Sequence, residues 1–298
     1  MKKAEFHLRG GIFFYVKEKE GISILEYQGN EVTVEVPKEI ENIPVTGIGK
    51  KAFLSNKKVR RVILPETVKI IENWAFSHCS QLESVTFSKD VVLGKGAFLD
   101  CVKLRKIHLC PVWEEAVANF IPFLLAAVPV MLDADYLFVP REAGTNSWLQ
   151  KWDARMLTIL RKDDEEGYTK VILCGEEDYG NNPEDFAKEK RKGKVRLAFL
   201  RLLYSYGLSE EIEKELKEYL LAHTKGCESE ETWEVLLLEH GEEAEYFQLF
   251  MDIGCVTEEN FQDILTDMKE DYPEMKGMLI RFKEEKLGYQ DFFEGLLL

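Results

Sequence analysis

The stretch that decides the fold runs from Ile48 to Leu109. It reads IGKKAFLSNKKVRRVILPETV over 48–68, IENWAFSHCSQLESVTFSKDV over 71–91 and LGKGAFLDCVKLRKIHL over 93–109. The pair Ala-Phe recurs at residues 52–53, 75–76 and 97–98, at intervals of 23 and 22 residues. The other positions that keep the same phase are Asn56, Cys79 and Cys101, then Val59, Leu82 and Leu104, then Val62, Val85 and Ile107, then Leu64, Phe87 and Leu109. Self-similarity at a fixed period of this length indicates a solenoid.

Each copy combines a strand with a return segment. In Val59-x-x-Val62-x-Leu64 the last two apolar residues alternate, as they do in a strand that buries one face. The Ala-Phe pair then lies on a turn or short helical piece that brings the chain back. One copy buries about six apolar side chains at roughly 2 kcal/mol each, whereas ordering its backbone costs on the order of 1 kcal/mol per residue. A single copy therefore does not fold alone, and stacked copies must share one core.

The pattern IxxxAFxxCxxLxxVxF resembles the BspA-like family of bacterial leucine-rich repeats. The resemblance covers residues 48–109 and extends upstream through GNEVTVEVPKEIENIPVTGIG, where Val34-x-Val36-Pro37 mimics Val62-x-Leu64-Pro65. It implies a repeat solenoid and a role in binding other proteins. Before these residues, GIFFYVKEK and GISILEYQ predict two short strands that form an N-terminal hairpin cap.

After Cys110 the repeat fades. ADYLFVP at 134–140 and YTKVILCG at 168–175 predict two further strands, TNSWLQKWDARMLTILRK predicts a helix, and the turn-rich residues 176–186 are the best candidate for a linker. From Lys188 onward, Ser or Thr followed by acidic residues and Gly at the far end punctuate a series of helices. We expect an α+β protein with three parts: a hairpin and N-terminal cap at 1–47, a solenoid with a divergent C-terminal part at 48–187, and an α-helical hairpin domain at 188–298.

The distribution of charge also separates the repeat-containing part of the chain from the rest. The whole chain is 45% hydrophobic, as a folded protein is, and has a net charge of −15. Residues 1–110 hold 18 basic and 13 acidic side chains, and residues 111–298 hold 21 basic and 41 acidic ones. An acidic chain is not expected to bind nucleic acid, because the phosphate backbone attracts positive faces. The most apolar window, 121–132, is too short to span a bilayer and contains two prolines, so we expect no membrane insertion.

No catalytic motif stands out. The five histidines fit no HExxH or other metal-ligand spacing, and neither a phosphate-binding GxxxxGK[ST] loop nor a nucleophile GxSxG occurs. We therefore expect no enzyme, no catalytic residue, no metal and no cofactor. Cys79 and Cys101 occupy the same slot in adjacent repeats, where they are expected to be small buried side chains. A disulfide between them, or a metal site with His78, His108 and Cys110, are the alternatives.

The strand pattern also predicts a surface. If Val62, Val85 and Ile107 face inward, their neighbours face outward as two ladders. One ladder consists of Arg61, Ser84 and Lys106, and the other of Ile63, Thr86 and His108. These six residues would form a basic, partly apolar patch on the concave sheet, and an acidic protein partner, or the acidic tail of the chain itself, would suit it. A solvated face without function is the alternative.

The sequence thus favours a non-catalytic protein–protein interaction scaffold. An enzyme with a site in the helical part or at the junction, around His223 or His240, is the first alternative, and an exported surface adhesin is the second. The N-terminus has no apolar segment typical of a signal peptide. We expect a cytoplasmic protein if Met1 is the native start, and an extracellular or cell-surface one if a signal peptide was removed.

Overall fold

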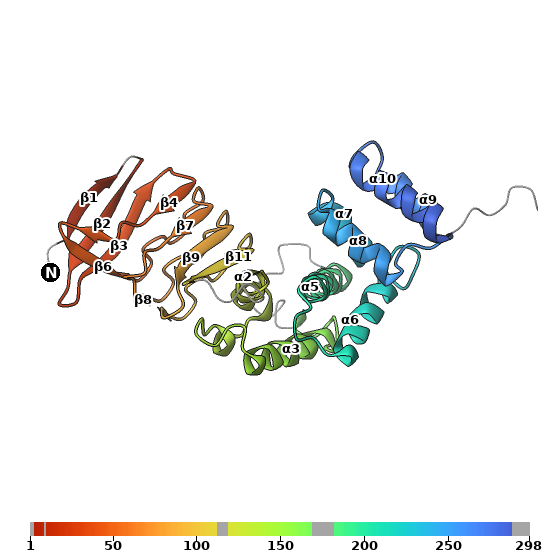
Figure 1. Cartoon of the computed structure of the whole chain (residues 1–298), viewed down its shortest axis with the longest axis horizontal. Coiled ribbons are helices and arrows are strands. Elements are labelled where there is room, and N and C mark those ends of the chain that lie inside the picture. The colour runs from red at the N-terminus through yellow and green to blue at the C-terminus, as the bar shows by residue number, and fades with distance from the viewer. Residues whose placement is uncertain (1–2, 9, 112–118, 169–181, 288–298) are drawn as a thin grey trace, which may run out of the picture. The chain divides into compact units, whose positions relative to one another are not determined.

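The computed structural model describes the chain except for residues 1–2, 9, 112–118, 169–181 and 288–298 (Figure 1). The strands are β1 (Ala4–Leu8), β2 (Gly11–Lys17), β3 (Ile22–Gly29), β4 (Thr33–Glu35), β5 (Glu39–Ile40), β6 (Ile43–Ile48), β7 (Arg61–Ile63), β8 (Ile70–Ile71), β9 (Ser84–Ser88), β10 (Val92–Leu93) and β11 (Lys106–Cys110). The helices are α2 (Ile121–Ala127), η1 (Val128–Leu132), η2 (Asp135–Leu137), α3 (Asn146–Leu160), α5 (Pro183–Leu203), α6 (Glu210–Ala222), α7 (Glu231–His240), α8 (Ala244–Ile253), α9 (Phe261–Asp267), α10 (Pro273–Phe282) and η4 (Lys283–Leu287).

The predicted solenoid is present. One strand from each turn joins a parallel sheet in the order β11-β9-β7-β4 (Figure 1). The registers pair Val34 with Val62, Val62 with Val85, and Val85 with Ile107. All four of these side chains are buried, because strand periodicity turns every second residue toward the shared core.

A second sheet closes the other side of the turns. Its strands follow the order β1-β2-β3-β6-β8-β10, and the pairs β3–β6, β6–β8 and β8–β10 are parallel. The predicted hairpin cap corresponds to β2 and β3, which pair antiparallel. β1, which the sequence analysis did not predict, adds to β2.

The phenylalanines of the Ala-Phe pairs form a continuous stack inside the turns. The ring centroids of Phe53 and Phe76 are 4.8 Å apart, and those of Phe76 and Phe98 are 5.2 Å apart with an interplanar angle of 2°. Tyr27 of β3 stacks on Phe53 at 5.2 Å, and the ring of Phe138 meets Phe98 edge-on at 5.7 Å. The hairpin and the segment after the last turn therefore cover the two ends of one aromatic column.

Left-handed residues turn the chain around each ring. The residue before each Ala-Phe pair has a positive φ, as have Ser55, His78 and Asp100 two residues after the phenylalanine. Backbone bonds join these corners: Phe53 donates to the carbonyl of Ala75 at 2.7 Å, and Phe76 donates to that of Ala97 at 2.8 Å. Each non-glycine in this conformation costs about 1–2 kcal/mol, so the bonds and ring stacking between turns must offset a local strain.

Helical segments, rather than more strands, follow the last turn. α2 packs on β11, and α3 packs beneath it: the indole Nε1 of Trp152 donates to the carbonyl of Leu124 at 3.1 Å, and that of Trp148 to Leu137 at 2.9 Å. The predicted helix over residues 145–162 is confirmed. The predicted strand at 134–140 is wrong, because this segment contains the short 3-10 helix η2. Phe138, which follows this helix, packs against Phe98 of the last turn, and the segment pairs with no strand among the described residues.

The contacts divide the chain into two compact units, residues 1–159 and 160–298. The predicted bounds of 1–47, 48–187 and 188–298 remain predictions. Most of the predicted strand at 168–175 and the first part of the predicted linker at 176–186 lie outside the described residues. Asn182 caps α5 by accepting a hydrogen bond from the amide of Asp185 at 2.7 Å, so the helix begins before Lys188.

In the second unit α5 packs against α6, α7 and α8, and α8 packs against α10. The punctuation that predicted these helices works as expected at Ser209, whose hydroxyl caps α6, and at Gly254, which ends α8 with a φ of 94°. Ser229 is an exception. The N-cap position of α7 is Glu230 and has no side-chain cap, and the Ser229 hydroxyl donates to the carboxylate of Glu231 in the first turn.

A largely buried ion-pair network holds α5 to α7. The side chain of Glu231 is only 3% exposed, and Arg191 donates to it at 2.8 Å. Burial favours the neutral acid, but hydrogen bonds from Ser229 and Arg191 outweigh that cost and hold the pKa of Glu231 below its usual value. Arg191 also contacts Glu184 at 2.7 Å and Asp164 at 3.8 Å.

We expect Phe76→Ala to destabilise the first unit by about 3–5 kcal/mol, since it opens a cavity in the middle of the aromatic column. Leu99→Ala is the control, because the Leu99 side chain is 43% exposed beside the same column. Urea denaturation followed by circular dichroism measures both variants. Equal midpoints for Phe76→Ala and wild type would contradict the role of the column.

We expect Arg191→Met to lower the free energy of unfolding of the second unit by about 3 kcal/mol, because it leaves the buried carboxylate of Glu231 without its partner. Arg161→Met is the matched control: Arg161 pairs with Glu215 at 2.6 Å, but on the surface, and its loss should change little. The Arg191 effect should shrink as the pH falls through the folded-state pKa of Glu231, because the protonated acid no longer needs the guanidinium. Denaturation at neutral and acid pH tests both statements.

Candidate functional site

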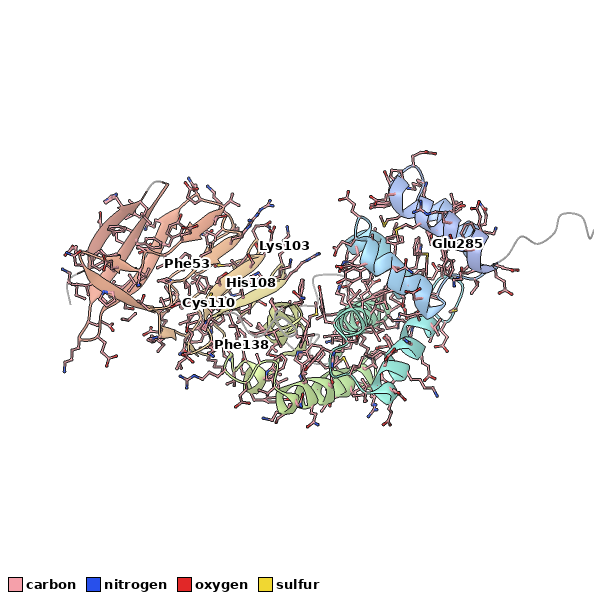
Figure 2. All side chains as sticks on the ribbon, in the orientation of Figure 1. Phe53, Lys103, His108, Cys110, Phe138 and Glu285 are labelled. Atoms are coloured by element: carbon pink, nitrogen blue, oxygen red, sulfur yellow. The ribbon has the colours of Figure 1, made fainter. Side chains whose placement is uncertain are left out.

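The parallel sheet brings the six predicted residues together. The register pairs Arg61 with Ser84 and Ser84 with Lys106, and the second row runs from Ile63 through Thr86 to His108. Adjacent strands lie about 4.8 Å apart, so each row is a line of neighbouring side chains. Figure 2 shows His108 on β11, the last strand of this sheet.

β4 extends both rows by one residue. Thr33 pairs with Arg61, and Glu35 pairs with Ile63. We call the eight residues the ladder face; they are Thr33, Arg61, Ser84 and Lys106 in the first row and Glu35, Ile63, Thr86 and His108 in the second. The sequence analysis missed Thr33 and Glu35, although the likeness of Val34-x-Val36-Pro37 to Val62-x-Leu64-Pro65 already carried the signal.

All eight side chains reach the surface. Ser84 and Thr86 are half-buried and the other six are exposed. Ile63 lies in the middle of the face and is an apolar side chain that is 40% exposed to solvent. Arg61 and Lys106 carry fixed positive charges at either side of Ser84, while Glu35 is negative, so the face is less basic than the sequence predicted.

α2 borders the face at its β11 side. The ammonium of Lys106 lies over the ring of Phe123, 4.8 Å from the centroid, in a cation–π contact. No sequence pattern pointed to Phe123. Although the His108 side chain is exposed, the neighbouring protein desolvates part of it, and this desolvation, with the charge of Lys106 second, lowers the pKa of His108 below its ordinary value. This shift favours the neutral imidazole over the charged form.

The loops beside the face carry charges of both signs. Arg60 contacts Glu83 of the next turn at 3.4 Å, and Lys103 donates to the side-chain oxygen of Gln81 at 2.9 Å. Lys58 donates to Asn30 at 2.6 Å on the other side. These contacts run between equivalent positions of neighbouring turns. The pair of Arg60 with Glu83 neutralises part of the positive charge around the ladder face, whereas the amides of Gln81 and Asn30 leave the charges of Lys103 and Lys58 in place.

The cysteine slot of the repeat is structural. The thiol of Cys79 donates to the carbonyl of Phe53 at 3.0 Å, and that of Cys101 to the carbonyl of Phe76 at 3.1 Å. Both are buried free thiols, as the sequence analysis expected, and each bonds to the preceding turn. Burial raises the pKa of Cys79 to about 11 and that of Cys101 to about 12, so neither thiol ionises at neutral pH.

Two open hollows lie on the first unit away from the ladder face. The larger, of about 1130 Å³, follows the second sheet, and its lining includes Lys38, Lys69, Glu66, Ile70 and Val92. The smaller, of about 390 Å³, lies along the corner from Lys50 to Asn56 and beside β3. Neither lining includes a histidine or a cysteine.

The histidines of the helical unit sit in structural networks. The Nδ1 atom of His223 lies 2.7 Å from the hydroxyl of Ser229, whose proton goes to Glu231. A catalytic triad needs the imidazole between the carboxylate and the hydroxyl, whereas here the hydroxyl lies between the other two groups. His240 stacks on Tyr246 at 3.6 Å and contacts Glu243 at 3.1 Å. Both arrangements fix helix ends.

The described residues contain no group of three or more His, Cys, Asp or Glu side chains placed to hold a metal ion. Within the same residues, no helix combines the length and the apolar character needed to cross a membrane.

The repeats match a known family. Residues 32–117 match six copies of the family described as BspA type leucine rich repeat region. The chain carries BspA-type leucine-rich repeats. The match begins at the residues just before β4 and includes all four strands of the ladder face, so these strands all belong to BspA-type turns. No curated protein matches the chain.

Solved structures of bacterial repeat proteins are similar to part of the chain. A leucine-rich repeat protein of T. pallidum is 32% identical, over 32% of this chain and 46% of that one, with a TM-score of 0.31. A leucine-rich cell surface protein of Faecalibacterium prausnitzii is 26% identical, over 36% of this chain and 30% of that one, with a TM-score of 0.30. A leucine-rich repeat protein of Bacteroides capillosus is 22% identical, over 40% of this chain and 91% of that one, with a TM-score of 0.31. The chain spans less than half the length of the first two.

We expect thiol labelling to separate the cysteines by burial. Cys79, Cys101 and Cys255 should resist iodoacetamide at pH 7.5 in the folded protein, because burial raises the pKa of each and closes access. Cys227 is exposed and serves as the internal positive control. Mass spectrometry of digested protein measures labelling at each site. Rapid labelling of Cys79 or Cys101 would contradict their place in the core.

Proposed function

We propose that the protein is a non-catalytic scaffold that binds another protein through the ladder face. The observation that carries the proposal is the in-register array on the sheet, in which charged, hydroxyl and apolar side chains project as neighbours from a rigid backbone. Such an array recognises a surface by complementarity without any chemistry of its own. Neither a cofactor nor a metal forms part of the proposal.

The chemistry of the array suggests the kind of partner. Arg61 and Lys106 flank Ser84, so the first row offers two cationic donors with a hydroxyl between them. The exposed Ile63 in the adjoining row supplies an apolar contact. A protein segment that combines carboxylates with an apolar side chain fits both rows. Glu35 at the β4 side would repel a uniformly acidic surface, so we expect the acidic groups to lie over β7, β9 and β11.

We expect the double variant Arg61→Glu/Lys106→Glu to lose the partner. Both residues are exposed, so the exchange should leave the fold intact while it reverses the charge of the first row. Wild type and variant would be used to capture partners from native lysate at low and moderate salt. The candidates would then be purified and their dissociation constants measured. We expect at least a tenfold loss of affinity, about 1.4 kcal/mol, and weaker wild-type binding at higher salt.

Lys38→Glu/Lys69→Glu is the matched control, because these exposed lysines border the hollow on the second sheet and their exchange makes the same change in net charge. Equal loss in both double variants would show an effect of net charge rather than of the ladder face. A partner retained by Arg61→Glu/Lys106→Glu would contradict the proposed surface. Ile63→Ala then tests the apolar contact without a change of charge.

The compartment of the protein limits the choice of partners. A cytoplasmic location and a cell-surface location both remain predictions. Fractionation of native cells, followed by detection of the protein in each fraction, tests both.

A further inference from the structure

β1 forms one outer edge of the second sheet. It pairs with β2 along five residues, from Ala4 opposite Tyr15 to Leu8 opposite Gly11. Its other side pairs with no strand in the described part of the chain, and the strand order ends there. An open edge presents a row of backbone donors and acceptors that can take a further strand.

The two faces of β1 differ in character. Phe6 lies opposite the buried Phe13, so Ala4, Phe6 and Leu8 share the face that β2 turns toward the core. At the edge this face is less well covered: Phe6 is half-buried and Leu8 is 40% exposed. Glu5 and His7 are exposed on the opposite face, with 3.4 Å between the carboxylate and the Nε2 atom.

Lys3 lies next to this edge, but its side chain does not point toward the open side. Natural sheets often place a lysine on an open edge to prevent pairing. Lys3 directly precedes β1, but its ammonium lies over the ring of Phe14 in β2, 3.9 Å from the centroid, and contacts Glu26 of β3 at 2.9 Å. Its side chain therefore reaches across the protein's own sheet, and its charge is paired there.

We propose that this edge is a self-association surface, on which β1 pairs antiparallel with β1 of a second copy about a two-fold axis at Phe6. In that register Glu5 lies opposite His7 of the partner subunit and His7 lies opposite the partner's Glu5. Phe6 lies opposite the partner's Phe6, and Ala4 lies opposite the partner's Leu8. Acid–imidazole and aromatic pairs directly across two strands stabilise their pairing.

Strand length and side-chain complementarity together favour this register, because the axis at Phe6 pairs β1 over its whole length. In an antiparallel pair, the side chains of directly opposed residues lie on the same face of the sheet. The two-fold axis must therefore lie between one residue of β1 and the same residue of the second copy. An axis at Glu5 would oppose two carboxylates, and one at His7 would oppose two imidazoles, whereas the axis at Phe6 makes both polar pairs complementary. A strand that complements its own sequence in this way fits a second copy of the chain, through an isologous interface.

The contact is short, so the dimer should be weak and concentration-dependent. Five residues a side fall well below the 20–30 residues a side of a standard interface. The pairing would join two copies through the second sheet and would not involve the parallel sheet that carries the ladder face. This inference therefore does not depend on the proposed function.

Disulfide trapping tests the register in the full chain. A Phe6→Cys variant, built on a Cys110→Ser/Cys174→Ser/Cys227→Ser background so that only the three buried thiols of Cys79, Cys101 and Cys255 remain, would be oxidised in a glutathione buffer and run on a non-reducing gel. We expect a covalent dimer, since directly opposed residues have Cα atoms within disulfide reach. Leu8→Cys on the same background is the control, because in this register its own counterpart lies several residues away. Equal dimer in both variants, or dimer only with Leu8→Cys, would overturn the proposal.

Charge exchange tests the pairing without a covalent bond. His7→Glu opposes two carboxylates at both polar pairs, and Glu5→His/His7→Glu restores two acid–imidazole pairs in the reverse order. We expect sedimentation equilibrium to show a dimer for wild type at high micromolar concentration, at least fivefold weaker association for His7→Glu, and recovery in the double variant. A wild type that stays monomeric at these concentrations, or a double variant as weak as His7→Glu, refutes the proposed dimer.

Discussion

The match between ring stacking and strand spacing underlies the whole first unit. Phe53, Phe76 and Phe98 stack at 4.8 and 5.2 Å, and neighbouring strands of a sheet are separated by about 4.8 Å. Because the two distances agree, a turn can place its ring on the column and its strand on the sheet at the same time. The in-register rows of the ladder face follow from this agreement, since each ring holds its turn at one height.

A column of this kind needs covers at both ends. The hairpin provides one, through Phe13 and Tyr27, whose rings are 5.1 Å apart next to Phe53. The segment after the last turn provides the other, through Phe138 and the packing of α2 on β11. Each cover also shapes a surface: β1 extends the hairpin to an open sheet edge, and α2 brings Phe123 beside Lys106 at the ladder face. The hairpin and the segment after the last turn thus set the two ends of the repeat surface.

The two units hold together by different means. In the first unit, buried aromatic and aliphatic side chains form the column, and polar contacts between turns lie mostly at the rim. In the second unit, the pair between Arg191 and the buried Glu231 joins α5 to α7, and Arg196 pairs with Glu239 at 2.6 Å on the same two helices. The acidic character of residues 111–298 is therefore partly internal, because several carboxylates of the helical unit already face cations of the same unit.

The sequence by itself determined the period, the strand phase and the outward direction of six ladder-face residues. It also determined most of the helices after Lys188, because Ser209 and Gly254 mark helix ends through local bonds. Only the tertiary structure decided that residues 135–137 form a 3-10 helix rather than a strand, since contact with Phe98 overrides the strand-like pattern around them. It also decided that Arg191 of α5 pairs with Glu231 of α7. The tertiary structure also placed Phe123 at the ladder face, because its position depends on how α2 packs on β11. No local sequence pattern encodes contacts between segments that are far apart in the chain.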